Sequence, residues 1–544
     1  MEHYFLGVDV GTGSARAGLF DSNGALFASA KHDIRIWKEP GEVVEQSSED
    51  IWAAVCVCVR QAVAAAGVRP DQVAGIGFDA TCSLAALGPG GAPMPVGLHG
   101  DPARNIIVWM DHRATGQAER INRIGGNVLK YVGGIISPEM ETPKLLWLAE
   151  NMPETFRSAW QFMDLTDFLT WRATGSLARS MCTVTCKWTY LAHESRWDET
   201  YFRSIELGAL ADEGFRRIGV DIVPGGTPLG DGLTSQAARE LGLTPGAPVA
   251  AGLIDAHAGG VGSVGGRGGA GGALTRMAYV FGTSACTMSS TRDAVFVPGV
   301  WGPYFSAMVP GLWLNEGGQS AAGAAIDHLI QMHPAAPAAS RLAADAGESL
   351  SGWLARRAES AGGAAAVERL LGALHVVPEF LGNRAPFADP HARAIIAGVG
   401  LDSDVDSLVG LYLAGLCGIG YGARQILESQ RNRGIRTETI VVSGGASQTP
   451  LVRQLLADAT GLAVAATKTP EPVLLGSAIL GSVAARHYDS VEAAMEKMSE
   501  LGEAHQPTRE TAAWHAERFS AFERLQEVGR ELREVGRVPR ISAA

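Results

Sequence analysis

Short apolar runs separated by turn residues open the chain. The first run, residues 4–9, is followed by the turn Gly11-Thr12-Gly13 and a second apolar run, and a strand, a glycine-rich turn and a returning strand predict a β-hairpin. The spacing then becomes helical, with Ser48 as the expected N-cap and Gly67 as the expected stop. The predicted elements are strands at residues 4–9, 15–20, 25–31 and 73–78 and a helix at residues 48–66.

The same plan recurs in the second half of the chain. Residues 276–281 and 285–290 read as two strands joined by the small turn Gly282-Thr283-Ser284. Residues 439–442 read as a further strand, which is followed by the glycine pair Gly444-Gly445. A helix is expected at residues 449–460. The pattern predicts a degenerate duplication of one α/β unit, without the short repeats of a solenoid.

A glycine-rich tract separates the two halves. Nine of the residues from 259 to 272 are glycine, a composition that favours a flexible crossing over a packed helix. We therefore expect an N-terminal domain at residues 1–270, a C-terminal domain at 271–490 and a helical tail at 491–544. Within the tail, a helix near residues 512–535 should dock through Trp514, Phe519, Phe522, Leu525, Val528 and Leu532, whose spacing places them on one face.

Composition narrows the class of protein. A length of 544 residues indicates two or more domains, and a formal net charge of −12 argues against a nucleic-acid partner. Seven cysteines without a C-x-x-C pair are typical of reduced, mostly buried thiols in a cytoplasmic enzyme. The start lacks the positive segment of a signal peptide. Residues 408–423 are apolar but hold five glycines and fall short of the ~20 residues that span a membrane, so a buried helix and no membrane partner are expected.

The hairpin turn after residue 9 carries the strongest local chemical signal. Asp9 ends a strand, and the small residues that follow let backbone N–H groups approach a polyphosphate, while the carboxylate can hold hydrated Mg²⁺. An ordinary Asp/Gly turn remains the alternative. The turn at Gly282 and the pair Gly444-Gly445 offer similar donors, and together the three would grip one nucleotide between two domains. No Walker A sequence is present.

Asp255 lies between an apolar run and the glycine tract. Phosphoryl transfer to an alcohol needs a positioned carboxylate to accept the hydroxyl proton, and a carboxylate at a domain crossing would lose water on closure. A helix N-cap is the alternative reading, and one residue can serve both roles.

These segments together resemble the FGGY family of carbohydrate kinases, within the actin-like ATPase superfamily, over about residues 4–490. The matching pieces are residues 9–16, 109–113, 252–259, 282–284, 317–320, 382–390 and 443–448. The resemblance implies an α/β protein with two ribonuclease-H-like domains flanking an interdomain cleft, Asp255 as catalytic base and Asp9 near the Mg²⁺, through water. It also implies ATP contacts from Gly11, Thr12, Gly13, Ser14, Arg16, Gly282, Thr283, Ser284, Gln319, Gly323, Gly444, Gly445, Ala446 and Ser447.

Residues 78–84 resemble the D-ribulokinase branch of the family. From residue chemistry alone, a polar cluster after an apolar strand can form hydrogen bonds to several sugar hydroxyls, although an ordinary Asx/ST turn has the same composition. Lys144 stands where ribulokinases place a lysine that can polarise a ketone, with an exposed helix lysine as the alternative. The expected sugar contacts are Asp79, Thr81, Cys82, Ser83, Asp111, Arg113, Lys144 and Asp255.

The resemblance implies ATP-dependent phosphorylation of D-ribulose to D-ribulose 5-phosphate. Ribitol, L-ribulose and xylulose stay open as acceptors, because hydroxyl placement cannot be read from one sequence. An actin- or chaperone-type ATPase clamp on a polypeptide is the alternative from another class, but its peptide-binding domain would not fit in the tail. A homodimer is a family expectation only.

Overall fold

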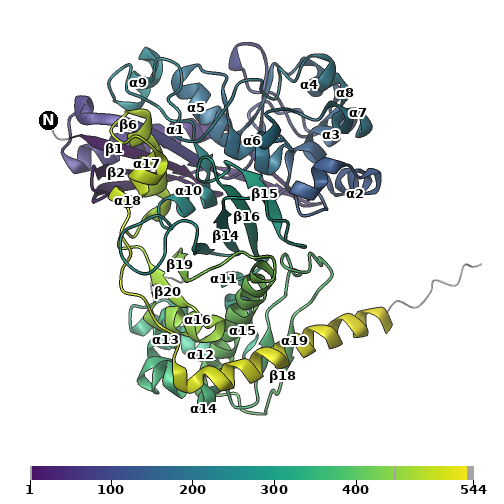
Figure 1. The fold of residues 1–544 in the computed structure, drawn as a ribbon, viewed down its shortest axis with the longest axis vertical. Coiled ribbons are helices and arrows are strands. Elements are labelled where there is room, and N and C mark those ends of the chain that lie inside the picture. The colour runs from purple at the N-terminus through teal and green to yellow at the C-terminus, as the bar shows by residue number, and fades with distance from the viewer. Residues whose placement is uncertain (1–2, 446–448, 536–544) are drawn as a thin grey trace, which may run out of the picture.

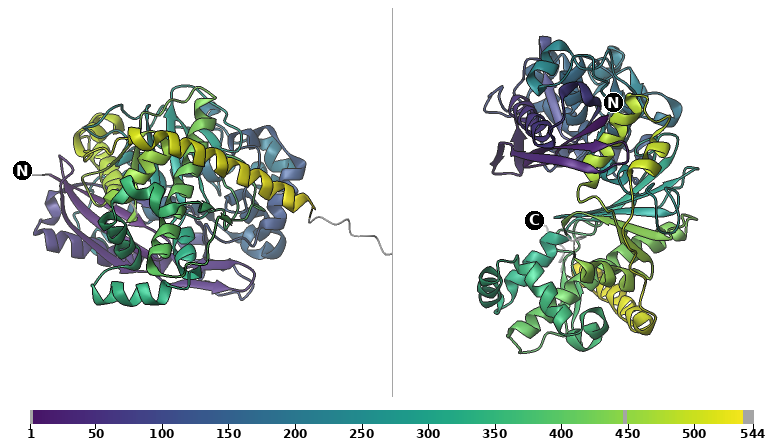
Figure 2. Two further views of the ribbon diagram at one scale, coloured as in Figure 1. Left: turned by 90° about the horizontal axis from the view of Figure 1, so that it is seen from below. Right: turned by 90° about the vertical axis from the view of Figure 1, so that its left-hand side faces the viewer.

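The computed structural model describes residues 3–445 and 449–535. The chain forms two lobes stacked along its long axis, each with a central β-sheet and helices packed against it (Figures 1 and 2). Ala446, Ser447 and Gln448 of the predicted nucleotide loop lie outside the described residues.

The sheet of the N-terminal lobe has the strand order β12-β6-β1-β2-β3. Strand β1 runs parallel to β6 and antiparallel to β2, and β12 runs parallel to β6. Its members are β1 (Tyr4–Val10), β2 (Ser14–Asp21), β3 (Leu26–Asp33), β6 (Val73–Ala80) and β12 (Leu253–Ile254). The predicted strand positions are therefore confirmed to within a few residues.

The sheet of the C-terminal lobe repeats this topology. Its order is β15-β16-β14-β13-β19-β20, and β13 is antiparallel to β14 but parallel to β19, as β1 is to β2 and β6. Its members are β13 (Arg276–Phe281), β14 (Ala285–Thr291), β15 (Trp301–Phe305), β16 (Trp313–Gln319), β19 (Thr439–Ser443) and β20 (Ala463–Ala466). The predicted duplication is thus confirmed at the level of strand order and direction.

Smaller sheets and helices complete the lobes. A second sheet of the N-terminal lobe has β4 (Ile36–Glu39), β5 (Val43–Gln46), β8 (Ile106–Ile107), β7 (Leu84–Leu87) and β9 (Gln161–Asp164), and two strand pairs are β10 (Arg179–Ser180) with β11 (Ile222–Val223) and β17 (His375–Val377) with β18 (Ile395–Ala397). The helices before residue 262 are α1 (Ser48–Ala66), α2 (Thr115–Ile124), α3 (Glu141–Asn151), α4 (Pro153–Ser158), α5 (Leu165–Thr174), α6 (Met181–Lys187), α7 (Glu199–Ser204), α8 (Gly208–Asp212), α9 (Ser235–Leu241) and α10 (Asp255–Val261). Those after it are α11 (Gly323–Met332), α12 (Ala336–Asp345), α13 (Leu350–Ser360), α14 (Val367–Leu371), α15 (Val405–Arg431), α16 (Pro450–Thr460), α17 (Pro472–Ala484), α18 (Val491–Met498) and α19 (Ala512–Val535).

The N-cap of helix α1 lies one residue before the predicted position. The Ser47 side chain, not that of Ser48, accepts the backbone N–H of Asp50 at 3.4 Å, so Ser47 is the N-cap. Gly67 ends the helix in a left-handed conformation, as expected, because a residue without Cβ adopts it at no steric cost.

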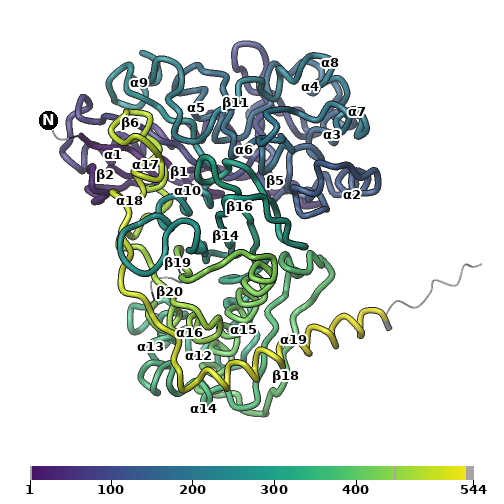
Figure 3. The backbone as a smooth tube through the Cα atoms, in the orientation of Figure 1, coloured from purple at the N-terminus to yellow at the C-terminus, as the bar shows by residue number. Residues whose placement is uncertain are grey.

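The chain returns to the N-terminal lobe near its end. Helix α17 lies against β1 and β6, and α18 packs on α17 (Figure 3). Residues 472–498 therefore pack with the first lobe, whereas the sequence division placed residues 271–490 in the C-terminal domain. Nothing in the local sequence pattern indicates that the apolar helix α17 packs on the first lobe, because it follows the elements of the second lobe directly in the chain.

The glycine tract is less flexible than its composition suggested. Gly259 and Gly260 lie inside α10, and this helix packs directly on α17. A Cβ on Gly476 of α17 would stand 1.8 Å from the carbonyl oxygen of Ala258, so the two backbones touch. Here close helix packing overrides the weak helix propensity of glycine.

Replacing Gly476 with alanine should destabilise the protein by about 3 kcal/mol, because a backbone carbonyl cannot move aside as a flexible side chain can. The measurement is the apparent melting temperature. Gly116→Ala is the matched control, since Gly116 is also helical but a Cβ there meets nothing within 4 Å. Equal melting temperatures for the two variants would contradict the close approach of α10 and α17.

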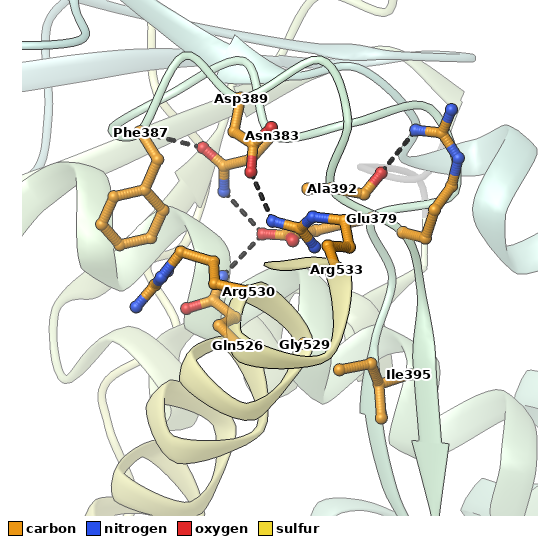
Figure 4. A pocket seen from close by; sticks show the side chains of 11 residues that line it. Glu379, Asn383, Phe387, Asp389, Ala392, Ile395, Gln526, Gly529, Arg530 and Arg533 are labelled. Atoms are coloured by element: carbon orange, nitrogen blue, oxygen red, sulfur yellow. Dashed lines mark hydrogen bonds and ion pairs between the residues drawn. The ribbon is translucent and has the colours of Figure 1, made fainter. Parts of the chain in front are cut away.

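Helix α19 crosses the outer face of the C-terminal lobe (Figure 1). Phe519 and Phe522 are buried, as predicted, but Val528 and Leu532 are 46% and 65% exposed, so the docked face ends before the last turns. Near that end, Gln526 donates to Glu379 at 2.6 Å and Arg533 pairs with Asp389 at 2.6 Å (Figure 4). The helix thus contacts the loop at residues 379–393, which carries Arg384.

Helix α15 is the one helix within residues 3–445 and 449–535 that is long and apolar enough to cross a membrane. Most of its apolar residues are buried in the core of the C-terminal lobe. The prediction of a buried helix at residues 408–423 is therefore confirmed. All seven cysteines are free, and six of them are buried.

Candidate active site between the lobes

Three carboxylates meet at one edge of the N-terminal sheet. Asp9 of β1 lies in register with Asp79 of β6, and Asp79 lies in register with Leu253 of β12, two residues before Asp255. Because these strands are parallel, their carboxyl ends share one edge of the sheet, where ligands bind in open α/β sheets. Asp255 is the first residue of α10 and accepts the N–H of Ala256 at 2.7 Å.

Each of the two predicted hairpin turns is closed by one backbone hydrogen bond, and the second turn is one residue shorter than the first. The N–H of Gly11 donates to the carbonyl of Ser14 at 3.0 Å, and the N–H of Gly282 donates to that of Ser284 at 2.9 Å. The first turn is held from outside, since Trp109 Nε1 donates to Thr12 Oγ1 at 3.0 Å. Small residues therefore present backbone donors from both lobes.

A cavity of about 360 Å³ lies between these turns. Asp255 lines it together with the Thr12 turn of the first lobe and the Thr283 turn of the second lobe. A site built in this way can bring two reactants together at the carboxylate, because each lobe contributes one side of the cavity.

Charged side chains of both signs line the rest of the cavity. They are Glu139, Lys187, Glu316 and Arg384, with Trp109 and Trp301 beside them. Lys187 Nζ lies 4.7 Å from the ring centre of Trp301, and Arg384 pairs loosely with Glu139 at 3.9 Å. The wall therefore offers both acceptors and donors to the hydroxyls and carbonyl of a small polar molecule.

The charges of this wall support one another. Burial alone would raise the pKa of Glu316, but the charges of Lys187 and His257 lower it to about 2. Burial likewise opposes the charge of Lys187, yet the acidic groups facing it, Cys82, Glu316 and Tyr304, raise its pKa well above the ordinary value. Both side chains are therefore charged at neutral pH, so that Lys187 can donate hydrogen bonds and Glu316 can accept them.

Asp255 has the opposite perturbation. Removal from bulk water and the neighbouring Asp9 carboxylate raise its pKa to about 6, although the Ala256 N–H favours the charged form. A carboxylate with this pKa is deprotonated at pH 7 but more basic than an ordinary aspartate, as a general base requires.

Asp9 faces an adjoining hollow of about 460 Å³ that also holds Arg16 and Glu471. Arg16 donates to Asp9 at 2.8 Å through Nε and to Glu471 at 2.8 Å through Nη1. Two carboxylates on an open hollow beside a phosphate-type turn fit hydrated Mg²⁺, which prefers oxygen ligands and retains several waters.

The structure places about half of the predicted site residues in the lining of these two spaces. Those in the lining are Asp9, Gly11, Thr12, Ser14, Arg16, Thr81, Cys82, Asp255, Gly282, Thr283, Ser284 and Gly444. Those outside it, among the described residues, are Gly13, Asp79, Ser83, Asp111, Arg113, Lys144, Gln319, Gly323 and Gly445.

Several of the outside residues have structural partners. Buried Asp79 accepts the Ser477 hydroxyl at 2.5 Å, and burial and Asp9 raise its pKa well above the ordinary value. Asp111 pairs with Arg113 and accepts the Val44 N–H. Gln319 accepts the Tyr279 hydroxyl, and the Gly323 N–H donates to Gly282, which holds the second turn.

Lys144 is fully buried and is not an exposed helix lysine. Its Nζ donates to the Glu139 carbonyl at 3.0 Å and to Glu141 at 3.2 Å, and it does not line the cavity. The lysine that does line it is Lys187, at the end of α6. Sequence reasoning missed Lys187, Glu139, Glu316 and Arg384, of which only Arg384 lay within a motif that the resemblance had marked.

Two family models match the chain in succession. The N-terminal domain of the FGGY family of carbohydrate kinases matches residues 4–262, and the C-terminal domain of that family matches residues 277–485. The chain belongs to the FGGY family of carbohydrate kinases. It is therefore a sugar kinase with the two-domain fold of that family, and the predicted family and fold class are confirmed.

Individual relatives agree with this family. The kinase is 45% identical over 97% of both chains to a human FGGY carbohydrate kinase domain-containing protein. It is 37% identical to a D-ribulokinase of Saccharomyces cerevisiae, over 89% of this chain and 72% of the yeast protein. The crystal structure of a xylulose kinase from Rhodospirillum rubrum superposes with a TM-score of 0.78, covering 97% of this chain and 99% of that one at 19% identity, which supports the shared fold.

Proposed function

We propose that this FGGY kinase transfers the terminal phosphoryl group of ATP to the terminal hydroxyl of D-ribulose, giving D-ribulose 5-phosphate. The observation that carries the proposal is the position of Asp255, which faces a cavity with a phosphate-type turn on each side. The similarity to a D-ribulokinase, at 37% identity over 89% of the chain, supports the choice of sugar. A polar wall around Lys187 and Glu316 suits an open-chain ketose.

In this proposal the nucleotide phosphates lie between the turns at Thr12 and Thr283, and their backbone N–H groups bind the phosphate oxygens. The sugar lies against Thr81, Lys187 and Glu316. Asp255 accepts the hydroxyl proton as the oxygen attacks the γ-phosphorus. Mg²⁺, held through water at Asp9 with Glu471 nearby, would neutralise charge on the phosphates. Closure of the lobes would exclude water from the cavity.

The choice of sugar is tested by coupled ADP release with D-ribulose, L-ribulose, D-xylulose and ribitol. We expect the highest kcat/KM with D-ribulose, by at least about tenfold, because a buried polar wall rejects a sugar whose hydroxyls leave its groups unpaired. A higher kcat/KM with another acceptor would overturn the choice of sugar and leave the kinase assignment standing. ADP release without any sugar would oppose the transfer itself.

The pKa of Asp255 predicts an acid limb in the pH profile. Because the base must be deprotonated, kcat/KM should fall as the pH drops through about 6, and at pH 5 it should be roughly tenfold below its plateau. The neighbouring charges that set this value are Asp9, His257 and Lys187. The residual activity of Asp255→Asn is the control and should lack this limb. A flat profile between pH 5 and 7 in the wild-type enzyme would contradict the role of Asp255.

A further inference from the structure

Three metal-ligating side chains meet within the core of the N-terminal lobe, close to the active-site cavity. Cys182, Cys186 and His257 are all buried, and one ligand atom from each lies within 4.8 Å of the other two. The Sγ atom of Cys182 lies 3.1 Å from Nδ1 of His257. None of the three lines the cavity or takes part in the proposed phosphoryl transfer.

The local fold brings these side chains together. Cys182 and Cys186 are four residues apart on α6, so they share one face of the helix. His257 lies in the first turn of α10, two residues after Asp255. Two bonds tie α6 to the strand before α10, since Ser180 Oγ donates to the Gly252 carbonyl at 2.6 Å and the Ile254 N–H donates to Cys182 Sγ at 3.4 Å. The cluster is therefore built from two elements that are fixed relative to each other.

We propose that Cys182, Cys186 and His257 form a binding site for one thiophilic divalent cation, of which Zn²⁺ is the best fit. Zn²⁺ takes thiolate ligands at about 2.3 Å and imidazole nitrogen at about 2.0 Å in a tetrahedron, which separates ligand atoms by roughly 3.5–3.8 Å. The three ligand atoms lie within 4.8 Å of one another, and the 3.1 Å contact between Cys182 and His257 would need to widen by only a few tenths of an ångström. Three protein ligands leave the fourth position open.

A contact to the imidazole ring of His257 favours a bound ion over side chains that are only packed together. Glu316 Oε2 lies 3.4 Å from Nε2 of His257, the ring nitrogen that faces away from Cys182. A carboxylate at the second nitrogen is the usual partner of a metal-bound histidine, because it fixes the ring orientation and strengthens the ligand.

The site differs in chemistry from the one at Asp9. Thiolate and imidazole ligands select Zn²⁺ and related soft ions, whereas Mg²⁺ takes oxygen ligands. The site adjoins the cavity wall, because Lys187 follows Cys186 in the chain and Glu316 contacts His257. A bound ion would hold α6 to α10 and thereby fix Lys187 relative to Asp255.

The test uses the full chain, freed of metal by a chelator under native conditions and kept in excess Mg²⁺. Titration with Co²⁺ should show uptake of one ion per chain, with thiolate-to-cobalt charge-transfer absorption and the strong visible bands of a four-coordinate ion. Zn²⁺ should displace the Co²⁺ and abolish these bands. Zn²⁺ should also raise the melting temperature of the metal-free protein, because an ion that binds only the folded state stabilises it.

Cys186→Ser and His257→Gln should each lose the thiolate–cobalt spectrum while keeping the circular dichroism of the folded protein. Cys56→Ser is the matched control, since Cys56 is a buried cysteine in the distant helix α1. Wild-type protein that takes up no Co²⁺ or Zn²⁺ under these conditions would overturn the proposal and show that the three side chains are only packed together. An unchanged spectrum in both site variants would overturn it as well.

Discussion

Asp255→Asn should lower kcat by about 10²–10⁴-fold while leaving the affinity for ATP almost unchanged. A positioned general base contributes this much to proton transfer, and asparagine keeps the size and hydrogen bonding of aspartate without its basicity. The Ala256 N–H, which now donates to Asp255, can donate equally well to an amide oxygen. The measurement is steady-state kinetics with saturating sugar, together with nucleotide binding by calorimetry.

Asp79→Asn provides the matched control, one strand away on the same sheet edge. Asp79 is buried, and burial and the neighbouring Asp9 carboxylate raise its pKa well above the ordinary value. Asparagine keeps the size and shape of aspartate, and its amide oxygen can accept the Ser477 hydroxyl as the carboxyl group does. We expect less than about a tenfold loss in kcat. Similar losses in both variants would show that the carboxylate network, rather than a base at residue 255, limits the reaction.

The elements that the sequence predicts well are those with a local pattern. The hairpin at Gly11, its counterpart at Gly282 and the buried helix α15 were all visible in the spacing of apolar and turn residues. The convergence of Asp9, Asp79 and Asp255 follows from the same pattern, because each comes at or just after the carboxyl end of a predicted strand. Parallel pairing then places these ends side by side.

The charged wall of the cavity has no such pattern. Lys187 ends a short helix, Glu316 lies within a strand, and Glu139 and Arg384 stand in loops. They meet only because the two lobes pack face to face, and no spacing in the chain records that packing. Two errors have the same origin: Gly259 and Gly260 are helical because α17 packs on them, and α17 itself joins the lobe from which it is most distant in sequence.

Lys144 shows a different limit of sequence reasoning. Its position at the start of a helix was predicted correctly, since α3 begins at Glu141. The direction of its side chain depends on tertiary neighbours, and the ammonium group bonds to Glu139 and Glu141 instead of entering the cavity. A family-based role for this lysine and the observed cavity lining therefore point to two different cations, and this difference can be measured.

Lys187→Met should raise the KM for the sugar by about 10- to 100-fold and leave the KM for ATP nearly unchanged. A hydrogen bond from a charged donor contributes about 1.5–3 kcal/mol, and its loss also leaves the buried carboxylate of Glu316 without one of the charges that balance it. Methionine is close in length to the lysine stem, so the packing against Trp301 can persist. The measurement is the KM for each substrate with the other saturating.

Lys144→Met is the paired variant, because Lys144 is equally buried but does not line the cavity. It should lower the melting temperature, since its bonds to Glu139 and Glu141 are lost, and it should change the KM for the sugar by less than about fivefold. The reverse outcome, with a large rise in sugar KM for Lys144→Met and little for Lys187→Met, would return the sugar-facing role to Lys144. It would require the sugar to bind outside the cavity between the two phosphate turns, because Lys187 and Asp255 both line that cavity and Lys144 does not.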